Sequence, residues 1–141
     1  MSLYLDTSFI GGLFIEADVF AARARAFFAA TDETLVVSDF AAAEFASVVA
    51  RVTRMNKIKD IEACTIFNGF DAWRARFVDE EAVVSLDIRA ATAIIRSLDL
   101  NIHAPDAINL AIARRLGASL VTFDRRMADN AHALGIAVAA I

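Results

Sequence analysis

The sequence predicts a three-layer α/β/α domain built around a central parallel sheet of four or five strands. Short apolar runs alternate with longer stretches of helical character along the 141 residues. Parallel strands need long crossover connections, which helices supply, so this alternation favours a parallel sheet with helices on both faces. With one Pro, five Gly and no repeat, the chain has no evident linker. We therefore expect a single domain over residues 1–141.

The individual elements follow from the spacing of apolar residues. The expected strands are Leu3–Leu5, Leu35–Ser38, Val83–Ser85, Leu120–Phe123 and Ile136–Val138. The expected helices are Val19–Ala30, Phe40–Arg54, Ile61–Phe77, Arg89–Ser97 and Ala107–Leu116, with a short one near Arg126–Leu134. Several ends carry typical boundary residues. Ser38 or Asp39 can cap the helix that starts at Phe40, Pro105 suits a first helical turn, and Gly117 follows a last turn.

Composition and charge exclude several classes of protein. The longest apolar stretches, such as Phe45–Ala50 and Leu134–Ile141, are far shorter than the roughly 20 residues of a membrane helix. The first residues, MSLYLDTS, lack the basic segment of a signal peptide. Cys64 is the only cysteine, so no intrachain disulfide can form. A soluble cytoplasmic protein without a membrane partner is expected.

A net charge of −4 argues against a protein that coats nucleic acid with a broad positive field. Local phosphate contacts stay possible, because the basic residues are grouped. The candidates are Arg51, Arg54, Lys57, Arg114, Arg125 and Arg126. The alternative is that each group is an ordinary solvated helix face.

Four acidic residues stand out by their positions. Asp6 and Asp124 directly follow predicted strands, where open α/β sheets place their ligand sites. Asp106 lies in the first turn of a helix, where the helix dipole favours a carboxylate. Glu44 shares a helix face with apolar residues, where a charge needs a partner. Taken singly, the three aspartates could be helix caps, turn residues or strand ends.

Taken together, these acids predict a metal site. Two like charges ~4 Å apart repel by about 4 kcal/mol at an effective dielectric near 20, so a carboxylate cluster needs a raised pKa or a bound cation. Ligation by oxygen alone suits Mg²⁺ or Mn²⁺, whereas zinc would need a Cys/His ligand set that the chain lacks. Thr7, Ser8 and Thr122 could orient the carboxylates or hold metal-bound water.

Four segments, in this order, resemble the PIN-domain family, and within it the VapC-type toxins of type II toxin–antitoxin systems. They are LYLDTS at the start, SDFAAAEFASVVAR at 38–51, APDAINLAIARRLGASLVTFD at 104–124, and a short helix after RRMA. The resemblance implies the PIN-like three-layer fold. It assigns the family's catalytic and metal-binding acids to Asp6, Glu44, Asp106 and Asp124. Asn109 departs from the His that many relatives carry.

By this resemblance the chain would be a Mg²⁺- or Mn²⁺-dependent endoribonuclease that hydrolyses RNA phosphodiester bonds by in-line attack and leaves a 5′-phosphate. It would be held by a small antitoxin and would form a homodimer. An apolar surplus fits a docked antitoxin or, equally, a well-packed core. Its residues are Ile10, Leu13, Phe14, Phe20, Phe27 and Phe28.

Other functions stay open at this stage. A metal-free mechanism would need a pair of histidines, but His103 and His132 show no spacing that suggests one site. A phosphatase or phospho-acceptor domain also places Asp at strand ends around Mg²⁺, although LDTS lacks the second Asp of a DxD motif. A catalytically inactive PIN fold that serves as a binding module is the third alternative.

Overall fold

The computed structural model describes residues 1–141 and contains a four-stranded, all-parallel sheet in the order β3-β2-β1-β4. The strands are β1 Ser2–Leu5, β2 Thr34–Ser38, β3 Val78–Glu81 and β4 Ser119–Val121. The helices are α1 Thr7–Phe14, α2 Ala21–Ala30, α3 Asp39–Arg54, α4 Asp60–Phe77, α5 Ser85–Arg96, α6 Ala104–Leu116 and α7 Arg125–Ala133. The expected fold class is confirmed.

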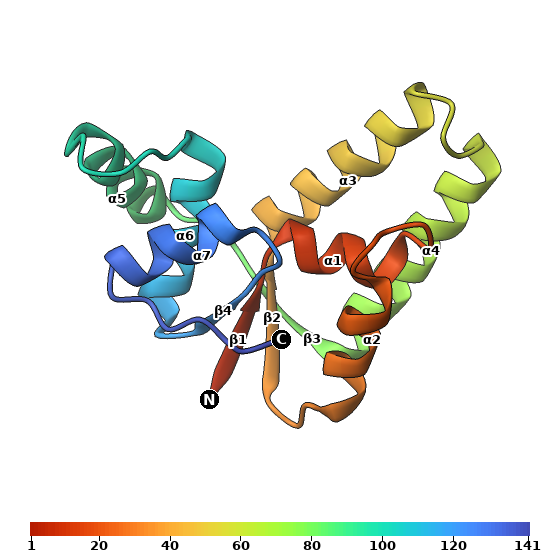
Figure 1. Ribbon diagram of the computed structural model, residues 1–141, viewed down its shortest axis with the longest axis horizontal. Coiled ribbons are helices and arrows are strands. Elements are labelled where there is room, and N and C mark those ends of the chain that lie inside the picture. Colours follow the sequence, from red (N-terminus) through yellow and green to blue (C-terminus); the bar gives the residue numbers. More distant parts are fainter.

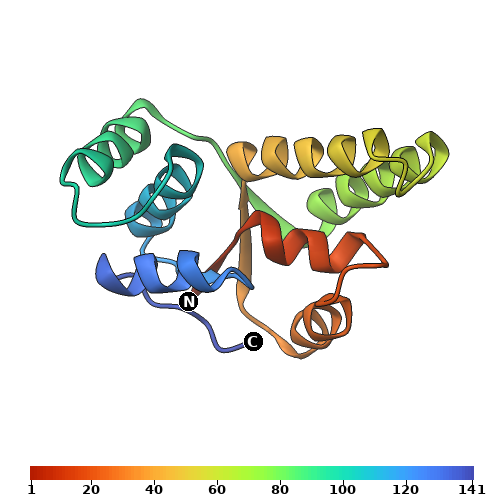
Figure 2. The same ribbon diagram turned by 45° about the horizontal axis from the view of Figure 1, so that its top comes forward.

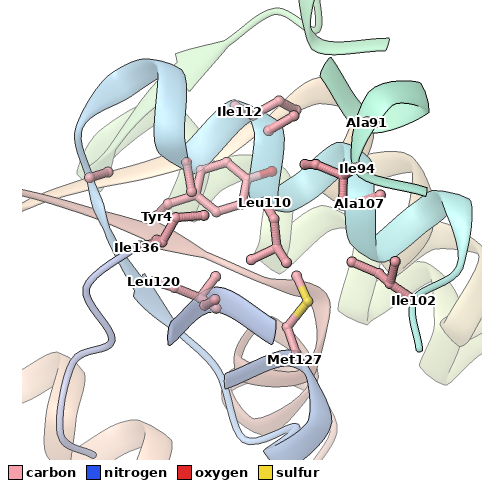
Figure 3. Packing of buried hydrophobic residues seen from close by; sticks show 14 of the residues in the cluster. Tyr4, Ala91, Ile94, Ile102, Ala107, Leu110, Ile112, Leu120, Met127 and Ile136 are labelled. Carbon is pink, nitrogen blue, oxygen red and sulfur yellow. The ribbon is translucent and has the colours of Figure 1, made fainter. Parts of the chain in front are cut away.

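The helices form two groups, one on each face of the sheet (Figures 1 and 2). Because side chains alternate along a strand, successive strand residues enter different cores. Leu3 and Leu5 pack with residues of α1 to α4, whereas Tyr4 packs with residues of α5 to α7. Figure 3 shows Tyr4 in this second core, close to Leu110 and Ile136. These two apolar cores hold the strands in register.

The boundary residues act as the sequence predicts. The Ser38 hydroxyl caps α3 by accepting a hydrogen bond from the backbone N–H of Ala41 at 2.9 Å. Pro105 lies in the first turn of α6. Gly117 ends α6 in the left-handed conformation, with φ of 62°. The other predicted helices are confirmed, with ends that differ by three residues or fewer except at the start of α5.

The strand predicted at Val83–Ser85 is wrong. The third strand is β3, and residue 85 is already the first residue of α5, a turn earlier than the predicted start at Arg89. The sequence of β3 is VDEE, and it pairs with β2 alone at the edge of the sheet. Edge strands often carry charged residues that deter further pairing, so β3 lacks the apolar pattern of a buried strand.

Two further predictions of strands need correction. The segment Ile136–Val138 forms only an isolated bridge, between Val138 and Leu120, so it is not a fifth strand. Strand β4 ends at Val121, before the predicted Phe123. The chain then turns, and Asp124 caps α7.

Helix α1 was absent from the prediction because Gly11 and Gly12 disfavour helix by about 1 kcal/mol each. Gly12 has a packing reason to be there: a Cβ at this position would lie 3.0 Å from Cβ of Ala24 in α2. The glycine therefore allows α1 and α2 to approach closely.

The apolar surplus of the first helices is packed rather than exposed. Ile10 is fully buried, and the Phe14 ring contacts the rings of Phe45, Phe70 and Trp73 at centroid distances of 5.3–5.9 Å. None of the six residues of that surplus is among the exposed large hydrophobic residues. The core alternative therefore accounts for them. No helix is both long enough and apolar enough to span a membrane.

Candidate active site

Asp6 is placed by the end of β1 and the start of α1. Its Oδ1 accepts hydrogen bonds from the backbone N–H of Phe9 at 3.1 Å and the Ser8 hydroxyl at 2.7 Å, and its Oδ2 accepts one from the Thr122 hydroxyl at 2.6 Å. The residue is 6% exposed, and no basic group pairs with it. Burial raises the pKa of Asp6, the three hydrogen bonds lower it, and the charge of Asp124 raises it further.

Glu44 lies in the second turn of α3 and is half-buried. Its Oε1 accepts a hydrogen bond from Nδ2 of Asn109 at 2.6 Å and a longer one from the Thr7 hydroxyl at 3.3 Å. Burial raises the pKa of Glu44, these hydrogen bonds lower it, and the charges of Asp106 and Asp6 raise it. A carboxylate with neutral donors and acidic neighbours lacks the cation that would compensate its charge.

A chain of hydrogen bonds through the protein interior links Glu44 to Asn109, Tyr4 and Ser38. The fully buried Tyr4 hydroxyl donates to Oδ1 of Asn109 at 2.6 Å and lies 2.6 Å from the Ser38 hydroxyl. Asn109 also donates to the carbonyl of Pro105 at 3.1 Å. Its amide is therefore fixed on both sides, with its N–H directed at Glu44.

Sequence reasoning missed this support and treated Asn109 only as a departure from the family pattern. The helical spacing contained a signal, because Asn109 follows Asp106 by three residues and therefore shares its helix face.

Asp106 and Asp124 complete the acidic cluster, by which we mean Asp6, Glu44, Asp106 and Asp124. Burial raises the pKa of Asp106, the charge of Asp124 raises it further, and the charges of Arg126 and His103 lower it. Nη2 of Arg126 is 3.9 Å from Oδ2 of Asp106, the only ion pair that the cluster makes. Asp124 caps α7 by accepting a hydrogen bond from the backbone N–H of Met127 at 3.0 Å.

The four acids thus come from four distant segments and meet at the carboxyl edge of the sheet, where acidic neighbours raise the pKa of Asp6, Glu44 and Asp106. As they stand, no three His, Cys, Asp or Glu side chains form a group that could hold a metal ion. Their donor chemistry nevertheless fits Mg²⁺, which usually binds one or two carboxylates together with waters and substrate phosphates rather than a cage of protein ligands. Two of the hydroxyl groups predicted to orient the carboxylates, Ser8 and Thr122, contact Asp6, and the third, Thr7, contacts Glu44.

The predicted basic residues do not share one surface. Arg51 and Arg54 line a groove that also contains Thr7 and Glu44. The others are dispersed: Lys57 lines an apolar pocket with Phe14, Arg114 lies beside Met1 at the amino end of the sheet, Arg126 pairs with Asp106, and Arg125 is exposed at the start of α7.

Comparison with known proteins identifies the family. The family model described as "PIN domain" matches residues 3–133, nearly the whole chain. The chain belongs to the PIN-domain family. Among curated protein sequences, no significant match to this PIN-domain chain is found.

Solved structures share the fold of this PIN domain at low sequence identity. VapC20 of Mycobacterium tuberculosis, described as a toxin that cleaves the sarcin–ricin loop, is 21% identical, with 91% of this chain and 94% of that chain covered and a TM-score of 0.72. FitAcB of Neisseria gonorrhoeae is 16% identical over 96% of this chain and 95% of that chain, with a TM-score of 0.69. VapBC2 of Rickettsia felis, bound to a promoter DNA fragment, is 16% identical over 88% of each chain, with a TM-score of 0.65.

Proposed function

We propose that this PIN domain is a metal-dependent endoribonuclease that hydrolyses RNA phosphodiester bonds, and that it is the toxin of a toxin–antitoxin pair. The observation that carries the proposal is the acidic cluster, in which the pKa values of three acids are raised by burial and by their acidic neighbours. Groups with such perturbed pKa values concentrate at functional sites. Arg126, which pairs with Asp106, brings only one positive charge to four acidic side chains.

The proposed cofactor is Mg²⁺ or Mn²⁺, held chiefly by Asp6 and Asp106 with help from Glu44 and Asp124. When bound, such an ion lowers the pKa of a coordinated water and stabilises charge on the scissile phosphate and the leaving oxygen. An all-oxygen donor set is the one that these hard cations prefer.

The side chains have separate tasks in this proposal. Asp6 is held in one orientation by three donors, so its carboxylate has little freedom to turn away from a bound cation. Asn109 fixes the direction of the Glu44 carboxylate through its 2.6 Å hydrogen bond. Asp124 contributes charge while it caps α7. By analogy with the family, hydrolysis would leave a 5′-phosphate.

The proposed partners are an RNA substrate, a small antitoxin and a second copy of the chain. Support for the antitoxin comes from similar folds, because the solved structures with this fold include a toxin–antitoxin complex from Klebsiella pneumoniae and VapBC2 of Rickettsia felis. An antitoxin is also physically reasonable, since an uninhibited cytoplasmic ribonuclease would damage its own cell.

The test is cleavage of a structured RNA by the purified protein with Mg²⁺ or Mn²⁺, with and without a chelator. Asp6→Asn is expected to slow cleavage by more than about 100-fold, because even residues that only support metal ligands typically contribute 10–100-fold. The matched control is Asp129→Asn, an exposed acid on α7, which should cut like the parent. If Asp6→Asn cuts as fast as the parent, the proposed site is wrong.

A second measurement tests the cation without relying on activity. Mn²⁺ should raise the melting temperature of the parent and of Asp129→Asn, because a ligand that binds only the folded state stabilises it. The same addition should leave the melting temperature of Asp6→Asn nearly unchanged. An equal rise in all three proteins would contradict cation binding at the acidic cluster.

A further inference from the structure

A groove runs from the acidic cluster along helix α3. It has a volume of about 440 Å³ and is lined by Thr7, Glu44, Ser47, Val48, Arg51 and Arg54, with Pro105 on its far side. Helix α3 extends outward from the carboxyl end of β2 (Figures 1 and 2). The groove residues later in α3 therefore lie farther from the sheet than Glu44 does. We call it the α3 groove. One end of it is acidic and the other is basic.

The helical repeat explains this arrangement. The five α3 residues of the groove stand at positions 44, 47, 48, 51 and 54, which lie on one face of a helix. At 1.5 Å per residue, Arg51 is roughly 10 Å along the axis from Glu44, and Arg54 is roughly 15 Å away. The basic end is therefore within reach of a ligand that also touches the acidic cluster.

The two arginines have no partner inside the protein. Neither forms an ion pair, whereas Arg74, Arg115 and Arg126 each do. Both are exposed, in a chain whose net charge is −4. Two unpaired guanidinium groups on one groove wall are well suited to phosphate, which arginine can bind through paired N–H donors.

The polarity of the α3 groove also selects a charged ligand. Val48 is its only hydrophobic lining residue, while the larger pocket near Phe14 is lined by Ile58 and Ile66 and carries apolar character. The groove's volume of about 440 Å³ lies within the roughly 300–1,000 Å³ that is typical of ligand sites. A positive groove that follows a backbone is the usual surface for single-stranded nucleic acid.

We propose that the α3 groove binds the single-stranded RNA segment on one side of the cleaved bond, with Arg51 and Arg54 each contacting a backbone phosphate. This inference rests on the proposed ribonuclease function and adds the path of the substrate. The scissile phosphate lies at the Glu44 end, and the strand continues along α3 toward its C-terminus. Arg114, at the opposite end of the sheet, takes no part.

The test measures how binding depends on salt. Fluorescence anisotropy of a labelled unstructured RNA is recorded in chelator, so that no cleavage occurs, at salt concentrations from 50 to 200 mM. For single-stranded RNA, loss of one arginine–phosphate contact should make the slope of log K for binding against log salt less steep by about 0.7. Arg51→Ala and Arg54→Ala should each show this change, and the double variant should show about 1.4.

Two matched control variants make the result decisive. Arg51→Lys should retain the parent slope because it keeps the charge. Arg114→Ala should also retain it, because Arg114 lies far from the groove. If the double variant has the parent slope, or if Arg114→Ala changes the slope as much, the proposed path is overturned. Competition by polyglutamate as strong as that by RNA of equal charge would also overturn it, by showing a general site for acidic polymers.

Failure of this inference can be told apart from failure of the proposed function. A protein that cuts RNA but shows no slope change in the arginine variants has the activity without this path. A protein with the expected slopes whose Asp6→Asn variant cuts as fast as the parent binds RNA in the α3 groove but does not use the acidic cluster.

Discussion

Replacement of Tyr4 by Phe tests whether the buried hydrogen-bond chain beneath Glu44 stabilises the domain. The change removes one oxygen from a fully buried ring and leaves the ring's packing in place. It leaves Oδ1 of Asn109 without the donor that lies 2.6 Å away, and it removes the 2.6 Å interaction with the Ser38 hydroxyl. A buried polar atom left without a partner costs about 1–3 kcal/mol. We expect Tyr4→Phe to lower the free energy of unfolding by about 2 kcal/mol.

The assay is urea unfolding at neutral pH, with the melting temperature as a second readout. For a chain of this length, each kcal/mol corresponds to a shift of about 4 °C. A double-mutant cycle with Asn109→Leu separates the Tyr4–Asn109 hydrogen bond from other effects. Asn109→Leu removes the acceptor that Tyr4→Phe leaves without a donor. The loss of stability in the double variant should therefore be smaller than the sum of the two single losses, by at least about 0.5 kcal/mol. A Tyr4→Phe destabilisation below about 0.5 kcal/mol, or strictly additive effects, would refute the reasoning.

Three further predictions concern stability. In metal-free protein the raised pKa of Asp6 means that its ionisation opposes folding, so stability is lost as pH rises from about 4, the ordinary Asp value, through the raised pKa. Urea unfolding in chelator should show that Asp6→Asn loses less stability over this pH interval than the parent does. Arg115 holds the pKa of the buried Asp87 below its ordinary value through bonds of 2.7 and 3.0 Å. Arg115→Met should therefore lower the free energy of unfolding by about 2–3 kcal/mol at pH 7. Loss of a fully buried ion pair would cost more, but Arg115 is 29% exposed. Acidification below pH 4 should also remove less stability from Arg115→Met than from the parent. Gly117→Ala should destabilise by about 1 kcal/mol from backbone strain at φ 62°, since no atom lies near the new methyl group, whereas Gly69→Ala in mid-helix should stabilise by up to about 1 kcal/mol. Equal melting temperatures for the two glycine variants would contradict this.

The sequence predicted best where burial and chemistry coincide. Strands β1, β2 and β4 are apolar because both of their faces are covered, and a carboxylate follows β1 directly. Strand β3 was not predicted because Asp79 and Glu80 in it are exposed, so no apolar pattern marks it. Helix α1 was not predicted because Gly11 and Gly12 disfavour a helix locally, although Gly12 is needed for the close packing of α1 against α2.

The three aspartates of the candidate site were expected from their places at strand and helix ends, and Glu44 from its apolar helix face, but the hydrogen bonds that support Glu44 were not expected. The hydrogen bond of Tyr4 with Asn109 joins residues 105 positions apart, and no local pattern reports such a pair. The separation of Arg51 and Arg54 from Arg114 likewise depends on which end of the sheet each helix reaches. The spacing of apolar residues predicts which face of a helix or strand a residue lies on. Only the tertiary structure decides which other residues contact that face.

The starts of helices α1, α6 and α7 all lie at the acidic cluster, since Asp6 and Asp124 cap two of them and Asp106 lies in the first turn of the third. Each helix start carries a partial positive charge of roughly half a proton, so three of them offset about 1.5 of the four formal negative charges. The resting protein can therefore tolerate the cluster before any ion arrives. The same offset weakens the pull on the proposed divalent ion. If the proposed function is correct, we expect the ion to exchange readily with the surrounding solution and the rate of RNA cleavage to follow the free magnesium concentration.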